Sequence, residues 1–182
     1  MAMTKPFLTD VETLRKRARD HMDEGPITSA YTADRDRVVG VLNEVLATEL
    51  VCYLRYKRHH FTARGINAGP IAAEFLEHAQ QELDHADQVA TRITQLQGDP
   101  NFSPDGLASR SHAEYAEGGS LLEMVREDLI AERVAIASYQ EIIRWLGDDD
   151  PTTAQVIRNI LAVEEEHADD LVNILEVMNG KR

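Results

Sequence analysis

Two segments of the chain repeat the same pair of residue types at the same spacing. Glu82 and His85 lie in HAQQELDHADQVA, while Glu164 and His167 lie in AVEEEHADDLV, and Ala-Asp follows each pair. Residues three apart share a face of an α-helix, so each pair projects a carboxylate and an imidazole together. Carboxylate oxygens and imidazole nitrogens are common ligands of divalent transition metals. The repeat therefore predicts a metal site to which two helices contribute.

Two further apolar segments each carry a single glutamate. Glu49 lies in LATELVCYLRY and Glu132 lies in LIAERVAIASY. Glu49 precedes Glu82 by 33 positions and Glu132 precedes Glu164 by 32, so two antiparallel helical hairpins would bring all four segments to the same depth. A glutamate from each of two helices and Glu-x-x-His from each of the other two is the ligand pattern of di-iron carboxylate bundles.

Such a cluster requires cations, because four buried carboxylates would repel one another and lose hydration at a cost of several kcal/mol each. We expect Glu82 and Glu164 to bridge two metal ions. Glu49 and His85 would complete the ligand set of one ion, and Glu132 and His167 would complete that of the other. Oxygen-rich sites with one nitrogen per metal suit iron(II) or manganese(II), and zinc could substitute without redox chemistry.

The elements that must position these residues are long helices. Turn and capping residues delimit four helical segments, from near Thr32 to about Gly65, from Gly69-Pro70 to Gly98, from Ser120 to Gly147 and from Asp150 to Asn179. No segment shows the alternation of a strand. We predict an all-α fold, a ferritin-like antiparallel four-helix bundle over residues 33–180 with a long crossover loop, preceded by an extension (residues 1–32) that contains a short helix.

Composition narrows the class of protein. The 182 residues suffice for one domain, and the net charge of −13 is opposite to that of most nucleic-acid-binding proteins. Basic and acidic residues balance within residues 1–25, so we predict no DNA binding. The single cysteine, Cys52, allows no intrachain disulfide. Without a signal-peptide pattern or an apolar run long enough for a membrane, the expected location is the cytoplasm.

Several neighbours of the predicted ligands have open roles. A histidine or an acidic residue one turn away could be an accessory ligand or a surface group, and a tyrosine could hydrogen-bond a ligand, donate an electron or only pack; these residues are His78, Asp128, Tyr56 and Tyr139. Cys52 is expected to be a small buried apolar residue. The run Arg55-Tyr-Lys-Arg58 with His59-His60 is expected to form a solvated helix end.

The segments TELVCYLRY, EFLEHAQQELDHAD, LIAERVAIASY and LAVEEEHADD resemble the motif segments of bacterioferritins and their Dps-like miniferritin relatives. The resemblance covers about residues 34–178 and all six ligand positions. It implies a ferroxidase, which binds two irons per subunit, oxidises iron(II) with O2 or H2O2, and stores the iron(III) inside a hollow homo-oligomer.

Departures from the family pattern refine this expectation. Leu83 stands where bacterioferritins have the methionine that binds haem, which argues against haem. The sequence ends just past the last long helix, and the segment SHAEYAE in the crossover could form a short helix. Both features resemble the dodecameric miniferritins, so twelve subunits are favoured over twenty-four.

Two other functions fit the same residues. One is a non-storage di-iron or di-manganese enzyme of the peroxidase, catalase or oxygenase type. The other is a structural bundle that serves as a scaffold. Iron retained per subunit separates the three, because storage needs many ions, an enzyme about two and a scaffold none.

Overall fold

A computed structural model describes residues 9–66 and 68–180 of the chain. Within these ranges the regular structure is helical, with no strand. The elements are α1 (Val11–Asp20), the 3-10 turn η1 (Met22–Glu24), α2 (Arg35–Thr62), α3 (Ala68–Gln95), α4 (Leu107–Arg110), α5 (Leu121–Leu146) and α6 (Pro151–Met178). The all-α prediction is confirmed.

Side-chain caps define where the long helices begin. Asp34, Ser120 and Asp150 precede α2, α5 and α6, and each accepts a hydrogen bond from the backbone N–H three residues later. These bonds satisfy N–H groups that have no partner within the helix. Pro151 opens α6, where its missing N–H costs nothing. Local sequence therefore fixes the ends of the helices, and through them the depth of each ligand.

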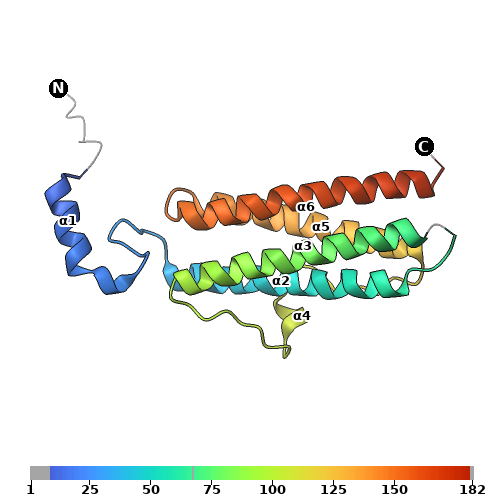
Figure 1. Cartoon of the computed structure of the whole chain (residues 1–182), viewed down its shortest axis with the longest axis horizontal. Helices are drawn as coiled ribbons and strands as arrows, with labels where there is room; N and C mark the ends of the chain where they lie inside the picture. The colour runs from blue at the N-terminus through green and yellow to red at the C-terminus, as the bar shows by residue number, and fades with distance from the viewer. Residues whose placement is uncertain (1–8, 67, 181–182) are drawn as a thin grey trace, which may run out of the picture.

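The four long helices form two hairpins that lie side by side (Figure 1). α2 packs mainly on α3, and α5 packs mainly on α6. The crossover from α3 to α5 carries α4 and runs along α2 (Figure 1). α1 stands apart from the bundle in Figure 1 and has no buried residue. This arrangement is the predicted antiparallel four-helix bundle with one long crossover.

The predicted crossover helix was placed wrongly. The short helix is α4, and the SHAEYAE segment, residues 111–117, is irregular. The backbone carbonyl of Glu114 accepts a hydrogen bond from Arg55, and the carbonyls of Ala116 and Glu117 face His59. These hydrogen bonds, together with the one that the His112 N–H donates to Thr48 Oγ1, hold the segment in an irregular path along α2.

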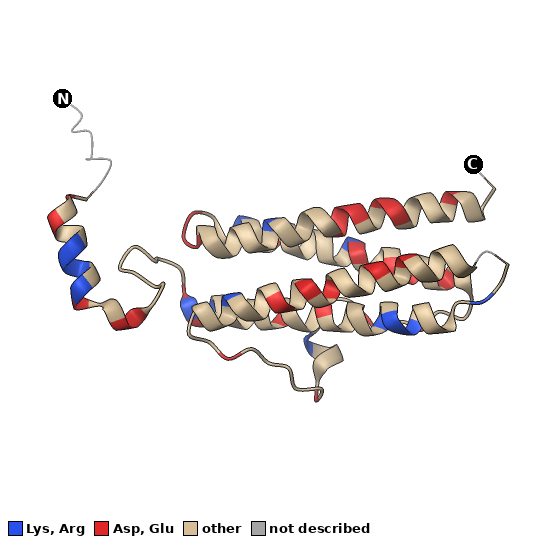
Figure 2. Ribbon diagram, in the orientation of Figure 1, with Lys and Arg blue, Asp and Glu red and all other residues tan. Residues whose placement is uncertain are grey.

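Apolar side chains form two large cores along the bundle and a third, small cluster of Cys52, Ala113 and Ala131. One contains Leu42, Val89, Ile142 and Ile157, near the start of α2 and α6. The other contains Phe75, Val125 and Leu171, toward the opposite end. The buried carboxylates and imidazoles of the six predicted ligands lie along the helices between the residues of these two cores, and Figure 2 shows acidic residues at mid-length on α3 and α6. We call this layer the polar waist, and it holds the predicted metal ligands.

Candidate metal centre

The structure brings all six predicted ligands together in the polar waist. None of them exposes more than 2% of its surface. The Nδ1 atom of His85 lies 3.2 Å from Glu49 Oε2 and 3.0 Å from Glu164 Oε1. The Nδ1 atom of His167 lies 3.2 Å from Glu164 Oε2 and 3.5 Å from Glu82 Oε1. Four helices therefore converge on one buried cluster.

The six residues form two overlapping groups of potential metal ligands. Within each group the ligand atoms lie within 4.8 Å of one another. One group consists of Glu49, Glu82, His85 and Glu164, and the other of Glu82, Glu132, Glu164 and His167. Glu82 and Glu164 belong to both groups, which is the arrangement expected of carboxylates that bridge two metal ions.

Several buried ligand atoms have no hydrogen-bond partner. They are Glu82 Oε1, Glu132 Oε2, both carboxylate oxygens of Glu164 and Nδ1 of His167. A buried polar atom without a partner is costly, and a buried charge more so. Two divalent cations would satisfy these atoms and neutralise the carboxylates, so the donor set fits a pair of metals.

The environment of the cluster shifts the pKa of its members. Burial, with the charge of Glu82 next, raises the pKa of Glu49 to about 7. Burial and the charges of Glu82 and Glu164 likewise raise the pKa of Glu132. Burial opposes the charged form of His167, but the Glu164 and Glu82 carboxylates beside its Nδ1 atom outweigh burial and raise its pKa to about 9. Without metal, the cluster holds protons where a cation would otherwise sit.

Gln81, which sequence reasoning missed, orients His167. Its Oε1 atom lies 2.8 Å from Nε2 of His167. The Gln81 oxygen is an acceptor, so Nε2 is the donor, and in the neutral ring the Nδ1 lone pair faces the carboxylates. Such a partner on the distal ring nitrogen fixes the tautomer that a metal needs. The only signal in the sequence was its place beside Glu82.

Each of the two tyrosines connects the hairpins. Tyr56 of α2 donates its hydroxyl hydrogen bond to Glu132 of α5, and Tyr139 of α5 donates to Glu49 of α2. Burial, followed by the adjacent carboxylate, raises the pKa of both phenols well above the ordinary value, so both remain donors. The reciprocal bonds hold the two non-bridging glutamates in place across the bundle.

The expectation of a solvated end on α2 was wrong for three of its residues, Arg55, Tyr56 and His59. Arg55 and His59 are completely buried. Arg55 Nε lies 2.7 Å from Asp128 Oδ1, and His59 Nδ1 lies 2.8 Å from Asp128 Oδ2. Asp128 is therefore the counter-charge of these two side chains, which in turn hold the crossover carbonyls. Cys52 is buried, as expected, and Glu165 and Glu166 are exposed.

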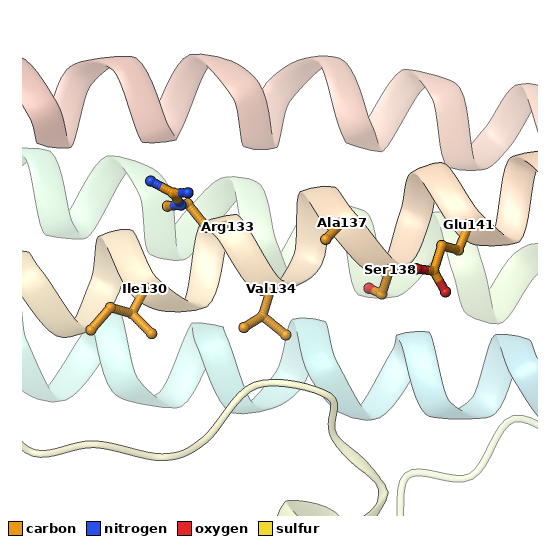
Figure 3. Close-up of a pocket in the computed structure, with 6 residues that line it drawn as sticks. All are labelled: Ile130, Arg133, Val134, Ala137, Ser138 and Glu141. Atoms are coloured by element: carbon orange, nitrogen blue, oxygen red, sulfur yellow. The ribbon is translucent and has the colours of Figure 1, made fainter.

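A surface hollow of about 490 Å³ lies along α5 (Figure 3). Its lining consists of Ile130, Arg133, Val134, Ala137, Ser138 and Glu141. None of the six predicted ligands lines it, so this hollow does not give a substrate access to the cluster.

A four-helix bundle with this cluster defines the class of ferritin-like carboxylate proteins. The sequence model of the ferritin-like domain matches residues 39–180, and the chain belongs to this family. Among curated relatives, the bacterioferritin of Desulfovibrio desulfuricans is 26% identical over 139 residues, which span 76% of this chain and 74% of the relative. A nutrient stress-induced DNA-binding protein of Synechococcus is 29% identical over 157 residues, 84% of this chain and 88% of the relative.

Solved structures give the same classification. The structure described as a dodecameric thioferritin, the bacterioferritin-related protein from Bacteroides fragilis, superposes with a TM-score of 0.78 at 27% identity. The match covers 92% of this chain and 96% of that one. In the described part of the chain, no helix has the length and apolarity needed to cross a membrane.

The stability of the metal-free protein should fall as pH rises from about 4.5 to 9. Glu49 has a pKa of about 7 when folded against an ordinary 4.5, so the folded state binds the extra proton and loses this advantage as pH rises through 7. His167, with a pKa of about 9 against 6.5, stabilises the fold fully below pH 6.5 and loses that contribution as pH rises through 9. Both groups act in the same direction.

Thermal melting in the presence of a chelator, at intervals across this range, measures the effect. The Glu49→Gln variant should show a flatter dependence between pH 4.5 and 7, because its amide does not titrate. Metal ligands must be deprotonated, so added metal should stabilise more at the alkaline end. A melting temperature of the metal-free protein that increases across the range would contradict the prediction.

Proposed function

We propose that this chain is a ferroxidase that oxidises iron(II) and stores iron(III). Two iron(II) ions would bind per subunit as substrate, bridged by Glu82 and Glu164. Glu49 with His85 would hold one ion, and Glu132 with His167 the other. Manganese or zinc could occupy the same positions, and haem has no part in the proposal. The observation that carries the proposal is the pair of overlapping ligand groups that share two carboxylates.

The residues of the waist suit this reaction. Each iron(II) gives up one electron, so a pair supplies the two electrons that reduce O2 to peroxide or H2O2 to water. Four carboxylates favour iron(III) over iron(II) because the added positive charge is neutralised in a buried, low-dielectric site. Gln81 keeps the His167 lone pair available, and the two tyrosines hold Glu132 and Glu49.

The relatives support the storage part of the proposal. Several are named bacterioferritin, and one similar structure is described as dodecameric. We infer a homo-oligomeric cage, with twelve subunits favoured. Other relatives are named for DNA binding or DNA protection, but the chain carries a net charge of −13. The absence of DNA binding stays a prediction.

Stepwise addition of iron(II) in air to the metal-free protein tests the proposal. Near-ultraviolet absorbance should show a fast phase that ends near two irons per subunit, as two ligand groups require. Iron that co-elutes with the oligomer should then continue to rise well beyond two per subunit. A fast phase without further retention would replace storage by a di-metal enzyme, and no fast phase would favour a manganese enzyme or a scaffold.

A further inference from the structure

A third cluster of potential metal ligands lies outside the six. Nε2 of His78 is 3.4 Å from Glu74 Oε1 and 3.8 Å from Asp170 Oδ2. The ligand atoms of the three residues lie within 4.8 Å of one another. The His78 side chain is 2% exposed, whereas Glu74 and Asp170 are 34% and 43% exposed. The cluster thus has a buried nitrogen at its base and two carboxylates at the edge of the solvent.

Hydrogen bonding sets which nitrogen of His78 is available. The single hydroxyl proton of Tyr56 is donated to Glu132, so the Tyr56 oxygen can only accept from Nδ1 of His78, 3.3 Å away. In the neutral ring, the Nε2 lone pair then faces Glu74 and Asp170. A lone pair and two carboxylates then converge on one point, and a divalent cation bound there would be coordinated by all three residues.

The third cluster adjoins the predicted centre. On α3, His78 lies four residues before Glu82, which is about 6 Å along the helix axis. On α6, Asp170 lies three residues after His167, on the same side of the helix. The His78 ring stacks on the His167 ring, with centroids 4.0 Å apart and planes inclined by 20°. The cluster therefore lies between solvent and the buried pair of ligand groups.

We propose that Glu74, His78 and Asp170 bind a third divalent cation in each subunit. If the proposed ferroxidase function holds, on which this second step rests, iron(II) from solvent binds here first and then passes to the inner ligands. The two half-exposed carboxylates attract the hydrated ion, and the buried imidazole provides a ligand next to His167. One nitrogen and two oxygens suit iron(II), manganese(II) or zinc.

Zinc binding to the metal-free full-length oligomer tests the site without any redox reaction. Titration calorimetry and metal analysis should give three zinc ions per subunit for the natural protein, two in the waist and one outside. The variant with Glu74→Gln and Asp170→Asn should bind two. A matched control, Glu77→Gln with Asp169→Asn, changes exposed acids on the same two helices and should still bind three.

The outcomes separate this proposal from the proposed function. Two zinc ions in the natural protein, or an equal loss in the control, would overturn the third site and leave the inner centre intact. Three zinc ions without a fast phase of iron oxidation would keep the site and overturn the ferroxidase. If both the third site and the ferroxidase activity are present, the fast phase of the Glu74→Gln, Asp170→Asn variant should still end near two irons per subunit. Its rate at limiting iron should be about tenfold lower. An unchanged rate would overturn the transfer step.

Discussion

The Glu82→Gln variant should lose the fast phase of iron oxidation, with a rate at least about 100-fold below that of the natural protein. Loss of a partner that only orients a metal ligand typically costs about 10- to 100-fold, and Glu82 is predicted to contact both metals directly. Glutamine has the same size but lacks the charge and one metal-binding oxygen. The same change removes one of four mutually repelling carboxylates, so the metal-free fold should not be destabilised.

Stopped-flow absorbance after mixing with two irons per subunit measures the rate, and anaerobic binding reports the affinity separately. Glu165→Gln is the control, because Glu165 is a solvent-exposed glutamate on α6, next to the other predicted bridging ligand, Glu164. It should oxidise iron at the natural rate. A Glu82→Gln variant that oxidised iron as fast as this control would exclude Glu82 as a bridging ligand.

The Asp128→Asn variant should lower the free energy of unfolding by about 3 kcal/mol or more. The substitution leaves Arg55 and His59 buried without their counter-charge, and breaking one partner of a buried ion pair typically costs about 3–5 kcal/mol. The two side chains also hold the crossover carbonyls. The damage should therefore extend to the crossover, which should become more open to proteolysis.

Urea unfolding of the metal-free protein at a fixed protein concentration gives the difference. Glu141→Gln, an exposed position on the same helix, should change stability by less than about 0.5 kcal/mol. If Asp128→Asn behaved like this control, the buried ion pair would contribute nothing to the fold. The rate of iron oxidation of the Asp128→Asn variant should fall only if the loss of the Arg55 contact also displaces Tyr56, which follows Arg55 in the chain and binds Glu132.

The bundle and the convergence of the six side chains could be predicted from the sequence, because both depend on the spacing of residues within each helix. Glu-x-x-His on one face, a lone glutamate in an apolar stripe and matched distances between them determine the depth of each residue. Arg55 and His59 could not be placed in this way. A basic run near a helix end is usually solvated, and the partner that makes burial possible, Asp128, lies 73 positions beyond Arg55.

The crossover shows a similar limit. Residues 111–117 have adequate helix formers, but tertiary hydrogen bonds from α2 override the local preference. His78 was an open case in the sequence for a related reason. Its spacing to Glu82 was visible, but the contact with Asp170 on another helix was not. The contacts that could not be predicted from the sequence are those between elements far apart in the chain, such as the crossover with α2 and α3 with α6.

The division of the apolar core by the polar waist has a consequence for how the molecule opens. Cooperative unfolding spreads through continuous packing, and here the apolar packing is interrupted by a layer of buried carboxylates and imidazoles. In the metal-free protein the two ends of the bundle should therefore exchange their amide protons as separate units, each with its own opening free energy. Two bound cations would join the halves through their shared carboxylates. Metal occupancy therefore decides whether the two ends of the subunit unfold locally as separate units or as one.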